Sequence, residues 1–235
     1  MKPALTVAVA VSAGSLLCGC VVVDSQAHVS REEKRFTVGG APELHLTTHD
    51  GAIEVRSGDD AGTVSVEIER RGPTKEALDE IHVDTKQDGD RIDVEVRKPA
   101  HEVIFLGIGP GTPSAKLVVT MPRKGNVVAK SGDGSILIDH VSGRLELRTG
   151  DGAVRGNEIS GQITVATGDG SVTLDSTEGE VDVETGDGGS VRSELHVGSD
   201  HDGESEKRSL RGRIGSGGKT LKIRSGDGSI RVKSN

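Results

Sequence analysis

The chain has 235 residues, and its 37 Asp and Glu outnumber 29 Lys and Arg for a net charge of −8 at pH 7. Such an acidic chain repels nucleic acid and anionic lipid surfaces, so we expect no nucleic-acid partner. Trp and Tyr are absent and the only aromatic residues are Phe36 and Phe105, which removes the stacking platforms that single-stranded nucleic acid needs and that sugar sites commonly use.

Residues 1–19 have the layout of a secretory signal peptide, in which one lysine precedes an apolar segment too short to span a bilayer. Two cysteines follow, Cys18 and Cys20, with Leu17 three positions and Gly19 one position before Cys20. This pattern resembles the bacterial lipoprotein box, so we predict lipidation at Cys20. The alternative is an ordinary signal peptide with incidental cysteines, which leaves Cys20 with no partner for a disulfide.

Cleavage after residue 19 removes one basic and no acidic residue, which gives the mature chain a net charge near −9. Acylation predicts an extracytoplasmic lipoprotein that is attached to a membrane surface, facing the periplasm or the cell exterior, without spanning the membrane. We expect residues 20–35 to form a polar tether and residues 36–235 a single all-β domain, with regular repeats over residues 125–235.

Less regular elements come first in this domain. Alternating apolar residues predict strands over Thr63–Glu69 and within Ile81–Val96, and a short helix is expected over Thr74–Glu80. A further strand is predicted over Ser114–Met121, where Pro122 ends it.

The tetrad Ser/Thr-Gly-Asp-Gly recurs in the second half of the chain. Its copies start at Ser131, Thr149, Thr167, Thr185 and Ser225. The first three spacings are 18 residues and the last is 40, so we expect a degenerate copy before Ser225, enlarged by a polar loop over Gly198–Arg211. Thr48-His49-Asp50-Gly51 predicts the same unit near the start of the domain.

Apolar residues alternate with polar ones on both sides of each tetrad, which predicts two strands per unit with one buried face each. The apolar columns are Val127, Leu145, Ile163, Val181 and Leu221; Ala129, Leu147, Val165, Val183 and Ile223; and Ile136, Val154, Val172 and Ile230. The tetrad glycines are expected to permit positive φ in the turns, and the aspartates to hydrogen-bond to nearby amides. These structural glycines are Gly132, Gly134, Gly150, Gly152, Gly168, Gly170, Gly186, Gly188, Gly226 and Gly228.

Two architectures can use such a unit: a solenoid in which each unit is one 18-residue coil, or an antiparallel meander in which each unit is a hairpin. The pattern favours the solenoid, because a meander would leave an apolar face that the chain has no helices to cover. Neighbouring coils must stabilise one another, since burial within a lone unit does not offset the cost of ordering its backbone.

The strand Leu117-Val118-Val119-Thr120-Met121-Pro122, followed by units of the Ser-Gly-Asp-Gly-Ser-Ile type, resembles the bacterial putative-adhesin family of β-strand-repeat proteins, which includes many lipoproteins. The resemblance covers about residues 36–235 and implies a right-handed parallel β-helix or β-roll outside the cell. It implies an adhesive role but supplies no functional residues to carry over, because the motif specifies a fold rather than an activity.

The acidic turn column is the sharpest chemical feature: a solenoid would stack Asp133, Asp151, Asp169, Asp187 and Asp227 along one edge at about 4.8 Å. These aspartates are candidate calcium ligands, which leaves a calcium-stabilised β-roll as an alternative. The order of known calcium-binding repeats is missing, however, and repulsion of about 0.9 kcal/mol in water does not demand a cation. The acidic cluster around His196 and His201 lacks fixed ligand spacing, so we interpret it as a solvated loop.

No catalytic residues and no cofactor are predicted. The Ser/Thr column of the tetrads has no histidine at a matching offset to act as base, and it is expected to form hydroxyl ladders. Gly218-Lys219-Thr220 resembles the end of a phosphate-binding loop, but Arg213 stands where that motif requires glycine. A polysaccharide-acting β-helix enzyme remains an alternative, although no groove of clustered acids and bases can be located.

We therefore expect a non-enzymatic, lipid-anchored scaffold or adhesin-like surface that binds a protein or envelope partner. An envelope-stress or signalling accessory protein would share the same anchor and fold. Ile230 and Val232 are expected to complete the last coil, with only three residues following. An uncapped coil presents unpaired backbone groups, which predicts self-association through the C-terminal edge.

Overall fold

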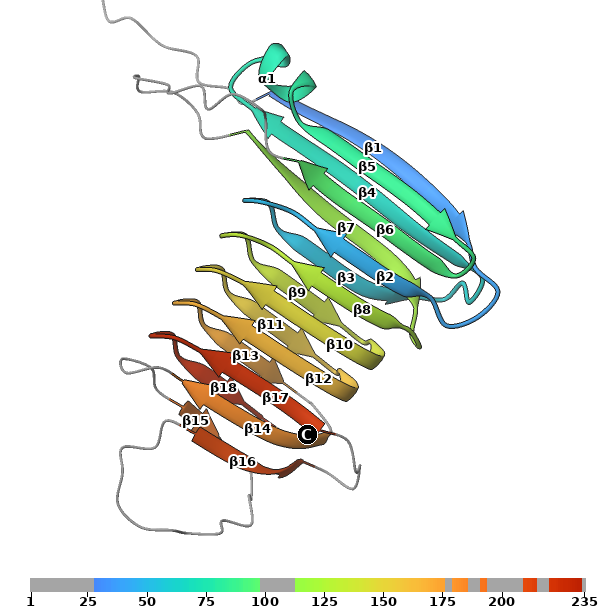
Figure 1. Ribbon diagram of the computed structural model, residues 1–235. Coiled ribbons are helices and arrows are strands. Elements are labelled where there is room, and N and C mark those ends of the chain that lie inside the picture. Colours follow the sequence, from blue (N-terminus) through green and yellow to red (C-terminus); the bar gives the residue numbers. More distant parts are fainter. Residues whose placement is uncertain are drawn as a thin grey trace, which may run out of the picture.

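The computed structural model describes residues 28–97, 113–175, 179–185, 191–193, 209–214 and 220–233. These residues form two facing nine-stranded sheets and one short helix (Figure 1). The prediction of an all-β fold is confirmed.

Each sheet has its own spatial order of strands. The first sheet contains, from one edge to the other, β1 (His28–Thr37), β4 (Thr63–Gly72), β7 (Ser114–Pro122), β3 (Ile53–Gly58), β9 (Ile136–Asp139), β11 (Val154–Asn157), β13 (Val172–Asp175), β18 (Ile230–Val232) and β15 (Val191–Ser193). The second sheet contains β5 (His82–Asp88), β6 (Arg91–Arg97), β2 (Glu43–Thr47), β8 (Asn126–Lys130), β10 (Ser142–Thr149), β12 (Ser160–Thr167), β17 (Thr220–Ser225), β14 (Gly179–Thr185) and β16 (Ser209–Ile214). Helix α1 is Lys75–Asp79.

Each repeat unit contributes one strand to each sheet. In the second sheet Leu145 pairs with Val127 on one side and Ile163 on the other, and in the first sheet Val154 is paired in the same parallel way. Because the two strands of a unit lie in different sheets, the chain does not adopt the hairpin meander. The sheets are nevertheless mixed, since β1, β4, β5 and β16 pair antiparallel near the two ends.

The early copy of the motif joins the same stack. Strand β2 pairs parallel with β8, placing Leu44 beside Val127, and β3 pairs parallel with β9, placing Ile53 beside Ile136. The prediction from Thr48–Gly51 is therefore confirmed, although the two units are far apart in the sequence.

The C-terminal unit is not at the end of the stack. Strand β17 lies between β12 and β14, and β18 lies between β13 and β15. The expectation that Ile230 and Val232 complete the last coil is therefore wrong, and the strands at that end of the sheets are β15 and β16. The described part of the segment before Ser225 does not show the expected degenerate copy, because β16 runs antiparallel to β14 instead of adding a parallel coil.

The core lies between the two sheets. The described members of the predicted columns are buried: Val127, Ala129, Ile136, Leu145, Leu147, Val154, Ile163, Val165, Val172, Ile223 and Ile230. Within the repeats, four further core residues were missed, namely Ile138, Val141, Ile159 and Leu174. Val141 and Ile159 each follow a residue with positive φ, His140 and Glu158, which takes them out of the alternating pattern.

Polar residues close the N-terminal end of the sandwich. Residues 28–35, expected in the tether, form most of β1, which pairs antiparallel with β4 along its whole length. Between the sheets Arg70 lies 3.1 Å from Glu32, and Lys34 donates to Thr85 in the opposite sheet at 3.1 Å. Inward-facing charges on an edge strand discourage further strand addition, so this end is blunted.

The other predicted elements of this region are confirmed. Strands β4, β5, β6 and β7 occupy the expected segments, and α1 forms where a short helix was predicted. The Thr74 side chain caps α1 by accepting a hydrogen bond from the Ala77 amide at 3.1 Å.

Several predictions concern residues that the structure does not describe. The signal peptide of residues 1–19, Cys20, Phe105, Asp187, the loop residues 198–208 and the cluster around His196 lie outside the described residues. Within the described ranges, no helix is long and apolar enough to cross a membrane.

Candidate functional site: the turn ladder and the charged faces

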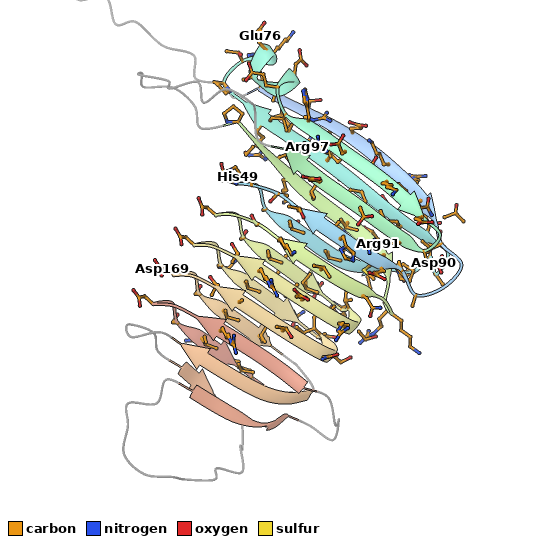
Figure 2. The ribbon with its side chains drawn as sticks, viewed as in Figure 1. His49, Glu76, Asp90, Arg91, Arg97 and Asp169 are labelled. Carbon is orange, nitrogen blue, oxygen red and sulfur yellow. The ribbon has the colours of Figure 1, made fainter. Side chains whose placement is uncertain are left out.

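The tetrad turns stack into a continuous backbone ladder along one edge of the sandwich, where His49 and Asp169 are labelled in Figure 2. The Gly132 amide donates to the carbonyl of His49 at 2.6 Å, and the Gly168 amide donates to that of Gly150 at 2.7 Å. Gly150 and Gly226 repeat the same bond to the preceding turn. The ladder therefore joins five turns, with the C-terminal turn placed directly after Gly168.

The Ser/Thr column reinforces this ladder from inside. The Thr149 hydroxyl donates to the Gly134 carbonyl of the preceding turn at 2.9 Å, and Thr167 donates to the Gly150 carbonyl at 3.0 Å. Both side chains are buried. The predicted hydroxyl column is present, but it bonds mainly to carbonyls of the neighbouring turn, which commits these oxygens to a structural role.

The turn glycines are required for a reason that differs from the prediction. Among the described glycines only Gly89, Gly143 and Gly161 have positive φ, so the tetrad glycines within the described ranges do not supply left-handed conformations. A Cβ atom on Gly152 would lie 2.2 Å from the Gly134 carbonyl oxygen, and one on Gly170 only 2.0 Å from that of Gly152. Close approach of successive turns therefore excludes side chains at these positions.

The aspartates of the tetrads stand at the exposed tips of the turns. Asp133, Asp151, Asp169 and Asp227 are all exposed, and a carboxylate oxygen of Asp133 lies 3.2 Å from the Cβ position of Gly150 in the next turn. The described residues contain no group of three or more His, Cys, Asp or Glu side chains that could hold a metal ion. A row of single carboxylates by itself does not define a metal site.

The outer face of the first sheet carries ion pairs that run across its strands. Glu69, whose side chain is only 10% exposed, accepts hydrogen bonds from Arg31 at 2.8 Å and from Arg71. Hydrogen bonds from Arg71 and then Arg31 hold the pKa of Glu69 below its ordinary value, although burial opposes this. The carboxylate is therefore fixed in its charged form between two guanidinium groups.

The outer face of the second sheet has a similar cluster at Arg91, labelled in Figure 2. The Arg91 guanidinium lies 3.0 Å from Asp93 and 3.6 Å from Glu43. The hydrogen bond from Arg91 lowers the pKa of Asp93. Further along, Arg97 lies 2.8 Å from Asp84 on the neighbouring strand. Both outer faces near the N-terminal end thus present alternating charges held in fixed positions.

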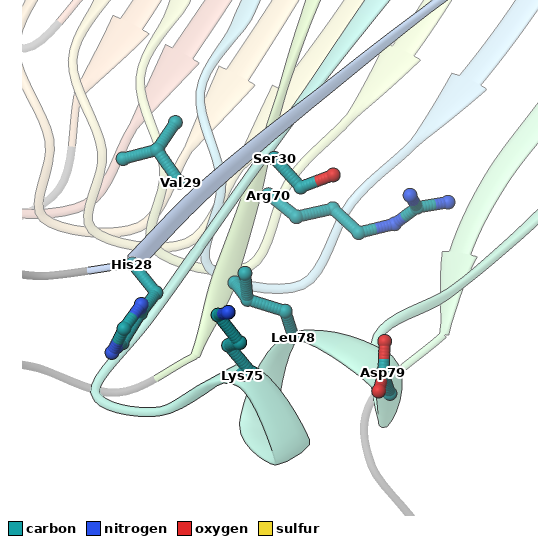
Figure 3. Close-up of a pocket in the computed structure, with 7 residues that line it drawn as sticks. All are labelled: His28, Val29, Ser30, Arg70, Lys75, Leu78 and Asp79. Carbon is teal, nitrogen blue, oxygen red and sulfur yellow. The ribbon is translucent and has the colours of Figure 1, made fainter.

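One hollow of about 330 Å³ lies between β1, β4 and α1 (Figure 3). It is lined by His28, Val29, Ser30, Arg70, Lys75, Leu78 and Asp79. Arg70 also bonds to Glu32. Burial is the largest single effect on the pKa of Glu32 and raises it, but Lys34 and Arg70 together hold that pKa below its ordinary value. The Nε atom of Arg70 is buried without a hydrogen-bond partner. The lining combines cations, a carboxylate and apolar side chains, so it selects no single class of ligand.

Exposed apolar surface is scarce over the described part of the chain. Its only exposed large hydrophobic residues are Val29 and Leu137, which are 47% and 37% exposed. A contiguous apolar patch is the usual mark of an apolar docking site. Any partner of the described surface must therefore contact charged faces, polar turns or strand edges.

The fold and these surfaces define a protein built from stacked two-strand units with polar faces. Residues 124–233 match the model of the family described as Toastrack DUF4097. The segment that contains β8 to β18 is therefore the part of the chain that is similar to the Toastrack DUF4097 family. No curated protein is significantly similar to the sequence.

The fold is similar to that of a solved "putative cell adhesion protein" from Clostridium sporogenes, with a TM-score of 0.62, 14% identity, and coverage of 88% of this chain and 100% of that one. A "putative adhesin" from Bacteroides fragilis has 14% identity over 86% and 97% of the two chains, at a TM-score of 0.34. A "putative lipid binding protein" from Parabacteroides distasonis has 12% identity over 86% of this chain and 96% of that one, at a TM-score of 0.32. The first likeness shows a shared fold, and together with the family match over residues 124–233 it confirms the resemblance to the putative-adhesin family.

Proposed function

We propose that this protein is a non-enzymatic, lipid-anchored scaffold of the bacterial envelope, with a solenoid-like stack of 18-residue units that presents an adhesin-like binding surface outside the cytoplasm. The observation that carries the proposal is a two-sheet stack whose described surface has only two exposed large hydrophobic residues.

The position of the N-terminal strand supports anchoring at one end. Seven residues separate Cys20 from His28, where β1 begins, and eight residue steps extend over at most roughly 29 Å. An acylated Cys20 therefore holds the blunted N-terminal end of the sandwich close to the membrane. The repeat units from β8 onward lie beyond β2 and β3, away from the anchored N-terminal end, where a partner can reach them.

The arrangement of polar groups supports a binding role without catalysis. The buried hydroxyls of Thr149 and Thr167 donate to backbone carbonyls, so they are engaged in the turn ladder. The charged clusters around Glu69 and Arg91 are paired internally. Fixed charges of both signs suit a complementary polar partner, because such faces give orientation and specificity more than raw affinity.

The anchor is tested by two matched substitutions. Cys20→Ala is expected to abolish incorporation of labelled fatty acid and to release the protein from the membrane fraction, while Cys18→Ala, two residues away, leaves both unchanged. Equal labelling of the Cys20→Ala protein would contradict anchoring at this residue.

The binding role is tested by crosslinking the anchored protein in its native cells and identifying what it contacts. A specific envelope protein or polymer is expected, and the charge-reversed double variant R91D/D93R tests whether this face is involved. A parallel screen for sugar release from cell-wall and acidic glycans addresses catalysis. Release of reducing ends by the purified protein would overturn the non-enzymatic proposal.

A further inference from the structure

The C-terminal unit, defined as residues 220–233 with β17 and β18, lies out of chain order. Chain order would place β14 and β15 directly on β12 and β13. Instead the C-terminal unit separates these neighbours in both sheets. The stack therefore contains a slot, bounded by β12 and β13 on one side and β14 and β15 on the other, that is filled by a segment from the end of the chain.

The slot keeps one register across both of its walls. Ile163 pairs with Leu221, and Leu221 in turn pairs with Val181. In the other sheet Ile230 pairs with Val172 on one side and Val191 on the other. Ile163 and Val181 are 18 residues apart, so direct closure of the slot would restore the regular repeat with no register shift. Each strand would keep its apolar residues on the same face, because only an odd shift exchanges the faces.

The contacts that hold the C-terminal unit are those of any repeat unit. The Val172 amide donates to the Ser229 carbonyl at 2.8 Å, and the Lys233 amide donates to the Leu174 carbonyl at 2.8 Å. Ile230 is 1% exposed. None of these contacts depends on which copy of the chain supplies the unit, so a second copy would make the same bonds and bury the same side chains.

We propose that two copies of this protein exchange their C-terminal units, each filling the slot of the other. The exchange conserves every pairing of β17 and β18, so its cost is the loss of independent motion of the two copies and any strain in the connections. The inference does not depend on acylation, so it is tested with the unacylated mature chain.

Residues Ala166 and Arg224 are paired neighbours on β12 and β17. Two single variants, Ala166→Cys and Arg224→Cys, are made in the chain of residues 20–235 with Cys20→Ser, which has no other cysteine. The two are incubated together at high concentration, diluted and oxidised. Exchange predicts a covalent heterodimer whose yield increases with incubation time.

The matched control mixes Arg148→Cys with Ala166→Cys. Arg148 and Ala166 are paired in the same way on β10 and β12, which belong to consecutive units of one chain. We expect a severalfold excess of heterodimer in the 166–224 mixture over this control. The double variant A166C/R224C should also form a disulfide within one chain at high dilution.

Two results would overturn the proposal. The first is heterodimer no more abundant than in the control while the double variant closes within its own chain, which would show that the slot holds only its own unit. The second is no crosslink between positions 166 and 224 in either the mixture of single variants or the double variant, which would show that β12 and β17 are not paired.

Discussion

Replacement of Gly152 by alanine tests the close stacking of the turns. A Cβ atom at this position would lie 2.2 Å from the Gly134 oxygen, 2.6 Å from its carbonyl carbon and 2.7 Å from the Thr149 hydroxyl. The first two atoms belong to the backbone of the neighbouring turn, so relief requires that the two turns separate by about 1 Å against a normal strand spacing of about 4.8 Å.

The cost follows from overpacking together with a weakened hydrogen bond. Overpacking a tight site costs about 1–3 kcal/mol, and the 2.9 Å bond from Thr149 to the Gly134 carbonyl contributes about 1 kcal/mol. We expect Gly152→Ala to lower the unfolding free energy by about 3 kcal/mol. The unfolding free energy of small proteins falls by up to about 3 kcal/mol per molar urea, so at this slope the urea midpoint of unfolding falls by about 1 M.

Urea unfolding followed by circular dichroism measures this change, and Gly40→Ala is the control. A Cβ atom on Gly40 would meet only the Asp90 carboxylate at 3.7 Å, so its midpoint should stay near that of the parent. Gly152→Asn distinguishes the two explanations of the turn, because asparagine tolerates positive φ but not a close approach. A parent-like midpoint for Gly152→Ala, or its recovery in Gly152→Asn, would refute the close-approach explanation.

Three further predictions concern the inserted unit, the ion pairs and calcium. Val232→Pro should destabilise the fold by about 3 kcal/mol or more, because Val232 is buried and β18 is paired on both sides. Thermal melting measures this loss, and an unchanged melting temperature would place β18 at an edge of its sheet. The pKa of Glu69 is lowered from its ordinary value of 4.5, so the stability that this carboxylate contributes is present above pH 4.5 and is lost as the pH falls through the folded-state pKa. The difference in unfolding free energy between the parent and Glu69→Gln should therefore shrink on acidification. A difference that stays constant with pH would contradict this. Added calcium or a chelator should leave the melting temperature unchanged, since the turn aspartates form no metal-binding group among the described residues; a calcium-dependent increase would support the β-roll alternative.

The sequence predicts the repeating part of the fold because burial has a visible period there. Leu145 and Ile163 are 18 residues apart, and parallel stacking places equivalent residues directly beside each other. The same logic located the early unit at Thr48–Gly51. Tertiary packing then only confirms what the alternation of apolar and polar residues already specifies.

The order of the last units could not be predicted, because the repeats are interchangeable at the level of pattern. The tetrads that start at Thr185 and Ser225 fit equally well beside the one at Thr167. Nothing in an 18-residue period specifies that Leu221, rather than Val181, pairs with Ile163. Only the three-dimensional arrangement resolves this choice.

The candidate surfaces were missed for a related reason. Strand β1 has charged residues on both faces, including Glu32 and Lys34 on the inner one, so it lacks the alternation that identifies a half-buried strand. The pair formed by Glu69 and Arg31 joins residues 38 positions apart. An antiparallel partner for β1 must be known before either interaction can be inferred.

The central claim is that each unit gives one strand to each of two facing sheets, with the C-terminal unit inside the stack. Interstrand nuclear Overhauser effects from the backbone of Val165 test it most directly. The structure predicts contacts to Leu147 on one side and Ile223 on the other. Contacts from Val165 to Leu174 of its own unit would show a hairpin, and contacts to Val183 in place of Ile223 would show simple chain order, so either result would contradict the claim.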